Sequence, residues 1–240
     1  MPDISLLDAS ALAVFLVGWI GYVRMVDGPD RNKHYFARAI GVYRARWIER
    51  MVMRPNRIGD AQLLGHVIRN VAFFSSTTIL IVAALLGVLG TAERSQLLTS
   101  ALPLAAETSR ALWELKVIVL IGVFVYAFFK LSWSLRQFNY CCILVGAAPE
   151  VGPQDPAGMP AEVRAEAEDL GRRAARLANL GGHHFNSAMR AYNFGLAVLP
   201  WFVHPVLFMA STAAVLAMMW RRDFHSRTRK ALTGEWQPGD

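Results

Sequence analysis

Long apolar runs, separated by short stretches rich in arginine, constrain this chain most strongly. Four regions carry few charges over lengths near or above that of a membrane-crossing helix: residues 6–23, 68–89, 115–136 and 192–220. A hydrocarbon core of about 30 Å takes roughly 20 helical residues at about 1.5 Å each. The pattern therefore predicts an all-α, polytopic transmembrane bundle that forms a single integral membrane domain over residues 1–240.

Composition agrees with a membrane location. Hydrophobic residues make up 54% of the 240 residues, which exceeds the usual share in a soluble protein. The net charge of +7 would suggest nucleic-acid binding in a soluble protein, but basic residues also gather on the cytoplasmic side of membrane proteins. We therefore expect a bilayer with anionic headgroups as the partner, and no nucleic acid.

The first apolar run is interpreted as a retained span and not as a signal peptide. Asp3 and Asp8 stand where a signal peptide carries basic residues, and no small-residue cleavage site follows the run. Trp19 and Tyr22 precede Arg24 in the manner of interfacial anchors. This reading places the N-terminus outside, with the protein in a bacterial inner membrane.

A basic helix is predicted over residues 31–54, within a stretch, residues 24–69, that holds ten basic residues. Its apolar residues recur at spacings of four, three, four and four: Phe36, Ile40, Tyr43, Trp47 and Met51. Arg31, Arg38 and Arg46 fall mostly on the other side. Two interpretations stay open, an amphipathic helix in the headgroup region and a helix packed on the protein's own cytoplasmic face. In the first, Arg38, Arg46 and Trp47 contact lipid.

Polar side chains interrupt the second and third spans. The second contains Asn70 and a run of hydroxyl residues that ends in Thr77 and Thr78, and the third meets its polar residues at its inner end: Lys130, Arg136 and Asn139. Hydroxyl groups serve helix packing, and long basic side chains reach to the interface. The competing interpretation is a hydrated pathway for an ion or a small anion.

A linker and a short cytoplasmic helix are predicted over residues 150–182. The linker is rich in proline, glycine and acid. In the helix, apolar residues repeat at four and three positions, a spacing typical of a contact between packed helices: Val163, Ala167, Leu170, Ala174 and Leu177. Leu170 and Leu177 are therefore candidate partner contacts. Gly181 and Gly182 are expected to end the helix.

The last apolar region is interrupted by Pro200, and by His204 before Pro205. If it crosses once, 17 basic residues lie inside and 8 outside; if it turns at His204 and returns, 22 lie inside and 3 outside. The positive-inside rule favours the hairpin, with the C-terminus in the cytoplasm. The prediction is thus four spans with a broken or hairpin final segment, giving four or five crossings.

Three runs of the sequence resemble a known family. They are RNVAFFSSTTILIVAALLGVL, FKLSWSLRQFNYCCILVGAAPE and HFNSAMRAYNFGLAVLPWFVHPVLFMASTAAVLAMMWRRDF. Together they resemble the membrane family described as domain of unknown function 599, found in bacteria and plants. The resemblance implies a single integral membrane domain and supplies no activity, ligand or catalytic residue.

The motifs of enzymes and metal sites are missing from the sequence. No serine elbow, phosphate-binding glycine loop or pair of carboxylates within a span occurs. The spacing of the histidines and cysteines fits no zinc or haem signature: His66, His183, His184, His204, Cys141 and Cys142. We therefore expect no catalytic residue, no metal and no cofactor.

Two functions remain as hypotheses. The first is a small homo-oligomeric channel or transporter for an ion or small anionic solute, with a polar pathway formed by six side chains: Asn70, Thr77, Lys130, Arg136, Asn139 and His204. The second is a membrane scaffold or accessory subunit that binds anionic lipid or partner membrane proteins. Transport requires the polar side chains to share a hydrated cavity, and scaffolding places them at headgroups or helix contacts.

Overall fold

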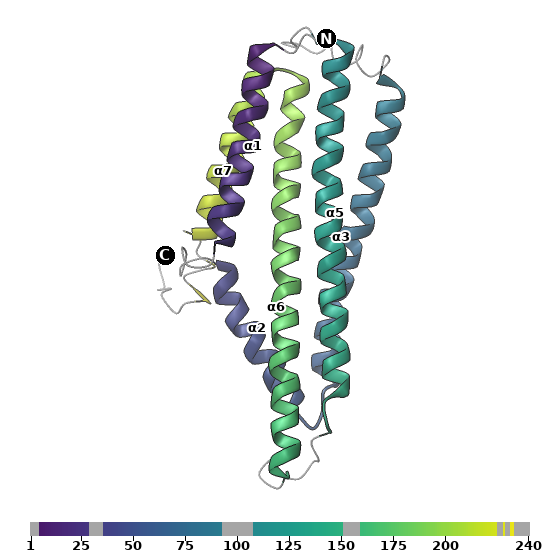
Figure 1. The fold of residues 1–240 in the computed structure, drawn as a ribbon, viewed down its shortest axis with the longest axis vertical. Coiled ribbons are helices and arrows are strands. Elements are labelled where there is room, and N and C mark those ends of the chain that lie inside the picture. The colour runs from purple at the N-terminus through teal and green to yellow at the C-terminus, as the bar shows by residue number, and fades with distance from the viewer. Residues whose placement is uncertain are drawn as a thin grey trace. The chain divides into compact units, whose positions relative to one another are not determined.

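A computed structural model describes residues 5–28, 36–92, 108–150, 159–224, 228, 231 and 232. The described residues form six α-helices, a short 3-10 helix and no strand (Figure 1). The elements are α1 (Leu6–Asp27), α2 (Phe36–Val52), α3 (Ile58–Gly90), α5 (Arg110–Ala147), α6 (Ala161–Val198), η2 (Leu199–Phe202) and α7 (Pro205–Phe224). The all-α prediction is confirmed.

Three helices are long and apolar enough to cross a membrane: α1, α3 and α5. With 33 and 38 residues, α3 and α5 extend about 50 and 57 Å, well beyond a hydrocarbon core of about 30 Å. The expectation that the third apolar region is too long for one crossing is therefore confirmed, because α5 continues unbroken past Arg136. These three helices indicate a membrane protein.

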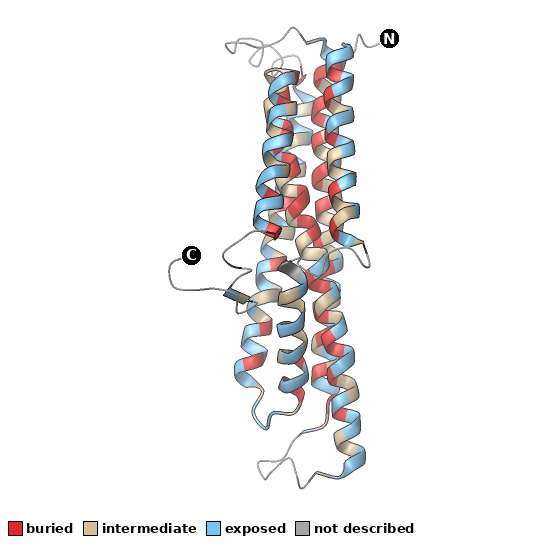
Figure 2. Cartoon of the chain, turned by 90° about the vertical axis from the view of Figure 1, so that its left-hand side faces the viewer, coloured by how far each residue is buried: buried red, intermediate tan, exposed pale blue. Residues whose placement is uncertain are grey.

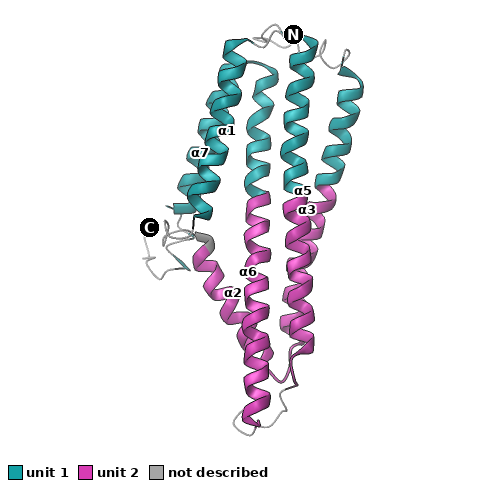
Figure 3. Ribbon diagram, in the orientation of Figure 1, with its two compact units in different colours: residues 1–36, 78–128, 189–240 teal, residues 37–77, 129–188 magenta. Residues whose placement is uncertain are grey.

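The chain divides into two compact units (Figure 3). Unit 1 comprises residues 1–36, 78–128 and 189–240, and unit 2 comprises residues 37–77 and 129–188. The helices α3, α5 and α6 contribute residues to both units.

Aromatic side chains form the core of unit 1. Phe15 of α1 contacts Phe194 of α6 and Phe208 of α7, with ring centroids 5.8 and 5.2 Å apart. The helices α1 and α7 pack along each other, and Gly18 permits their close approach, because a Cβ atom there would lie 2.9 Å from Leu216 Cδ1. Figure 2 shows that buried residues lie along one side of these helices and exposed residues along the other.

The last apolar region turns, as the sequence predicts. Pro200 lies in the short helix η2, so its missing N–H and fixed φ do not break a long helix. Pro205 is the first residue of α7, a position whose N–H has no partner within the helix. Ser211 Oγ of α7 donates a hydrogen bond of 2.7 Å to the Ala197 carbonyl near the end of α6. The two arms therefore lie against each other as a helical hairpin.

In unit 2, α2 packs on α6 and on the first turn of α3. Ile48, Met51 and Val52 are fully buried, and the Asn179 amide on α6 donates to the Gly41 carbonyl at 3.1 Å. Small residues line the buried side of α6: Gly171, Ala174, Ala175, Ala178, Gly181 and Gly182. The apolar side of α2 thus packs within its own unit.

The predicted end of a helix at Gly181 and Gly182 is wrong. The helix α6 runs without a break from Ala161 to Val198, because both glycines serve close packing. A Cβ atom at Gly181 would lie 2.9 Å from the Phe138 ring, and one at Gly182 would lie 2.2 Å from Arg44 Nη1. Tertiary packing therefore outweighs the weak helix propensity of glycine.

Candidate functional site

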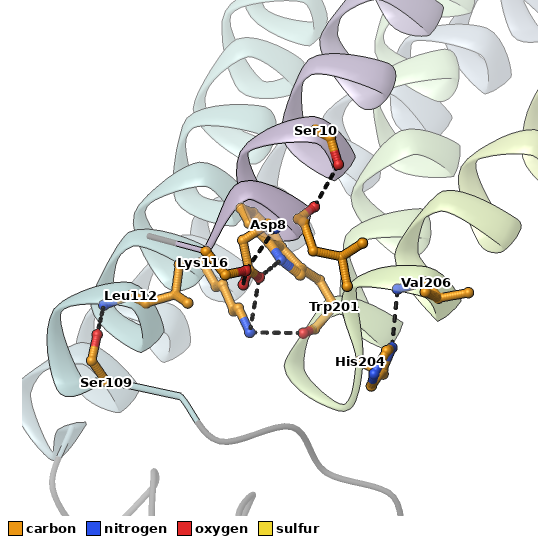
Figure 4. Close-up of polar contacts among 10 residues, drawn as sticks. Asp8, Ser10, Ser109, Leu112, Lys116, Trp201, His204 and Val206 are labelled. Atoms are coloured by element: carbon orange, nitrogen blue, oxygen red, sulfur yellow. Dashed lines mark hydrogen bonds and ion pairs between the residues drawn. The ribbon is translucent and has the colours of Figure 1, made fainter. Parts of the chain in front are cut away.

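A cluster of buried charged and aromatic side chains joins three elements of unit 1 (Figure 4). It contains Asp8 in the first turn of α1, Lys116 of α5 and Trp201 of η2, none of which is more than 5% exposed. Lys116 Nζ lies 3.8 Å from Asp8 Oδ1 and donates to the Trp201 carbonyl at 2.9 Å. The Trp201 indole N–H donates to the same Asp8 oxygen at 2.8 Å.

Local sequence sets the orientation of Asp8. Ser5 is the N-cap of α1, and its hydroxyl oxygen accepts from the Asp8 backbone N–H at 3.0 Å. The same hydroxyl donates to Asp8 Oδ2 at 2.6 Å. This reciprocal cap places a carboxylate at the positive end of the helix dipole. Both Asp8 oxygens therefore have donors from the protein itself.

The ammonium group of Lys116 also has its partners within the protein. Its ammonium group has the Trp201 carbonyl, the Asp8 carboxylate and the face of the Trp201 ring, whose centroid lies 5.6 Å away. The Trp201 ring in turn stacks on Phe208 at 4.7 Å. A buried ion pair is stable only when further hydrogen bonds satisfy the remaining donors and acceptors of the two charged groups. The cluster thus fastens the hairpin turn to α1 and α5.

A second set of charges lies near the other end of α1, also in unit 1. Arg190 of α6, which is 1% exposed, forms an ion pair of 2.9 Å with Asp27. The Tyr22 hydroxyl donates to Asp223 of α7 at 2.7 Å. Asp8 and Asp27 are 19 residues apart on one helix, which corresponds to about 29 Å. That length matches the thickness of a hydrocarbon core, as expected for charged groups at the two ends of a candidate span.

Sequence reasoning missed both charge clusters. It used Asp8 only as evidence against a signal peptide, and it gave no role to Lys116 or Arg190. The available signal was the presence of single ionisable residues within or beside apolar runs, which are costly in a membrane unless paired. Their partners are 108 and 163 residues away in sequence, so the pairing itself was not visible.

Five of the six residues of the predicted polar pathway belong to unit 2, and His204 belongs to unit 1. Asn70, Arg136 and Asn139 are exposed on unit 2, and the Arg136 guanidinium lies over the Trp133 ring at 5.3 Å. Lys130 is half-buried. Thr77 donates to the Phe73 carbonyl of its own helix at 2.9 Å. These placements are those of surface residues and helix packing.

His204 and Thr78, the last residue of the hydroxyl run, serve local structure in unit 1. His204 precedes α7, and its Nδ1 accepts a hydrogen bond of 3.2 Å from the Val206 backbone N–H. Thr78, which is fully buried, lies 2.6 Å from the Tyr192 hydroxyl of α6. The histidine thus caps a helix, and the hydroxyl group joins two helices.

The predicted lipid and partner contacts divide into two groups. Arg38 and Arg46 are exposed on α2. Trp47 is half-buried, and its indole N–H donates to Asp60 Oδ1 at 2.7 Å, so its polar edge is bound within unit 2. Leu170 and Leu177 are half-buried beside the buried Ala174. Arg31 lies outside the described residues.

Tyr43 departs from the face that the sequence assigned to it. Its side chain is 50% exposed, and that of the neighbouring Val42 is 48% exposed. The outer side of α2 therefore presents apolar and basic groups together, which we name the α2 outer face: Arg38, Val42, Tyr43, Arg46 and Arg50.

Within the described part of the chain, no group of three metal-ligating side chains converges. Cys141 and Cys142 are free thiols.

The comparisons with known proteins point to a family. No curated protein and no solved structure matches the chain. A family model described as "Protein of unknown function, DUF599" matches residues 10–228. This confirms the resemblance seen in the three sequence runs, and the chain belongs to the DUF599 family.

Proposed function

We propose that the protein is a non-catalytic membrane scaffold or accessory subunit whose α2 outer face binds anionic headgroups on the cytoplasmic side. The observation that carries this proposal is the mixture of exposed groups on that face. Three arginines surround Val42 and Tyr43, whose side chains are about half exposed. Basic groups attract anionic lipids, while apolar and aromatic groups enter the interface.

The short connection between α1 and α2 supports a location of α2 near the bilayer surface. The helix α1 ends at Asp27 and α2 begins at Phe36, so only eight residues join a span to α2. Fully extended, eight residues reach at most about 28 Å. With each arm of the α6–α7 hairpin crossing once, the chain has five crossings, and 22 of its 25 basic residues lie on the cytoplasmic side.

The attraction between the exposed arginines of α2 and an anionic surface is strong enough to make the protein prefer anionic lipids. Each basic residue near an anionic surface contributes about 1 kcal/mol at physiological ionic strength. Arg38, Arg46 and Arg50 together would contribute about 3 kcal/mol by that estimate. Trp47 and Met51 add nothing to this binding, because they pack within unit 2.

Transport is the second candidate. The observation in its favour is the presence of two buried basic residues, Lys116 and Arg190, in unit 1. Both form ion pairs within the protein, and three of the six side chains expected to line a pathway, Asn70, Arg136 and Asn139, are exposed on unit 2. The scaffold function therefore explains more of the arrangement.

Lipid retention tests the proposal. The full-length protein is placed in nanodiscs of equal parts phosphatidylglycerol and phosphatidylcholine, and the retained lipids are counted by native mass spectrometry. We expect wild type to retain phosphatidylglycerol preferentially, and Arg38→Gln/Arg46→Gln to lower that preference by roughly fivefold or more. Arg172→Gln/Arg173→Gln is the matched control, because these exposed arginines pair with Asp169 on α6.

Two results would count against the scaffold function. Equal loss of preference in both double variants would show that net charge alone acts. Flux of a small anion through proteoliposomes containing wild type, above that of empty liposomes, would instead favour transport.

A further inference from the structure

Arg44 points toward α6 within unit 2, on the opposite side of α2 from the exposed arginines. Its Nη1 donates to Asn179 Oδ1 at 3.2 Å, and Asn179 Nδ2 donates to the Gly41 carbonyl at 3.1 Å. The guanidinium lies so close to Gly182 that a Cβ atom there would be 2.2 Å from Nη1. The helix pair thus holds a guanidinium in a defined position.

The charge of Arg44 has no carboxylate partner among the described residues. A guanidinium has five N–H donors, and the structure gives this one a single acceptor, which is a neutral amide. Two nearby arginines of unit 2 are paired or satisfied: Arg54 binds the Asp60 carboxylate, and Arg57 donates to four backbone carbonyls. Arg44 therefore differs from the structural arginines beside it.

Partial burial makes this arrangement costly. Desolvation lowers the pKa of Arg44, and no nearby carboxylate opposes that effect. The group still stays charged at neutral pH, because a guanidinium is not deprotonated in proteins. A charge removed from water without a partner is expensive, whereas an anion bound to it recovers the cost. Arg44 is only partly buried, which leaves part of its surface open to solvent.

We propose that Arg44, held by Asn179 and Gly182, is a specific binding site for a phosphate group. The planar guanidinium presents paired N–H donors that match two phosphate oxygens, which favours phosphate over chloride. The phosphate is that of a lipid headgroup or of a free phosphate. The proposal deepens the function proposed above by adding a fixed site, and it rests on that function only where the source is a lipid.

Ligand-dependent stability tests the site. The thermal unfolding of the full-length protein is followed in a neutral maltoside detergent at constant ionic strength. Chloride is compared with inorganic phosphate, and short-chain phosphatidylglycerol with detergent alone. We expect phosphate, phosphatidylglycerol or both to raise the Tm of wild type by about 5 °C at saturation. A response to phosphatidylglycerol alone assigns a headgroup, and a response to both assigns any accessible phosphate.

Two variants identify the residue. Asn179→Asp keeps the size of the side chain and places a carboxylate beside the guanidinium, at the loss of the hydrogen bond to the Gly41 carbonyl, so it should abolish the rise in Tm by occupying Arg44. Arg44→Gln should abolish it by removing the charge. Arg46→Gln, on the exposed side of the same helix, should keep the full rise. If Arg44→Gln does not fold, Asn179→Asp still decides the outcome.

The proposal is overturned if wild type gains no stability from either ligand, or if Asn179→Asp responds as wild type does. Its failure is separable from failure of the headgroup function. A phosphate response that depends on Arg44, together with unchanged lipid retention in Arg38→Gln/Arg46→Gln, would keep this site and reject the α2 outer face.

Discussion

Lys116 and Asp8 form an ion pair of 3.8 Å in which the lysine side chain is 1% exposed and the aspartate side chain 7%. Trp201 contacts both members, through its carbonyl to the lysine and through its indole N–H to the aspartate. Three segments that are distant in sequence therefore meet at one pair of opposite charges.

Removing one member of this pair should destabilise unit 1 strongly. Breaking a buried pair leaves an unpaired charge and costs about 3–5 kcal/mol. We expect Asp8→Asn and Lys116→Met each to lower the free energy of unfolding by about that amount, measured by denaturant titration in detergent. The double variant should lose clearly less than the sum of the single losses. Additive losses would contradict the pairing.

Substitution by alanine should have different effects on stability at Gly171 and at Gly87, two glycines within helices. A Cβ atom at Gly171 would lie 2.7 Å from Val52 Cγ2, and valine cannot move aside easily. Gly171→Ala should therefore destabilise the α2–α6 contact by about 1–3 kcal/mol. Gly87 has nothing within 4 Å of the same position, so Gly87→Ala should be neutral or stabilising by up to about 1 kcal/mol. Equal effects in thermal unfolding would contradict the packing described.

Arg57 should hold the end of α5 in place. Its guanidinium donates to the carbonyls of Val145 and Ala148 at 3.2 and 3.1 Å, to Pro149, and to Val52 at the end of α2 at 2.7 Å. Arg57→Gln leaves these carbonyls without their donor. We expect faster amide hydrogen exchange at the ends of α2 and α5, with no change in α1. Unchanged exchange at residues 143–148 would show that the cap is dispensable.

Much of the architecture follows from the sequence because apolar length and proline placement are local signals. The three long apolar helices and the turn between Pro200 and Pro205 are of this kind. The continuation of α6 through Gly182 is not a local signal. It involves packing against Arg44, which lies 138 residues away in the sequence.

The candidate sites were less predictable, because their contacts join residues that are far apart in sequence. Ionisable residues were sought near the inner end of the third span, where Lys130 is half-buried and Arg136 is exposed. The buried charges are single residues in separate helices, and only the fold brings Lys116 to Asp8. Pairing across a long sequence separation requires the tertiary structure.

The side of the membrane that carries the α2 outer face is the most direct test of this account. A reporter active only in the cytoplasm, and separately one active only outside, is inserted within residues 151–158 and again after Lys230. We expect cytoplasmic activity at both positions, because α6 and α7 then each cross once and α2 faces the anionic leaflet. External activity after Lys230 would contradict the five crossings, and external activity within residues 151–158 would contradict the headgroup function itself.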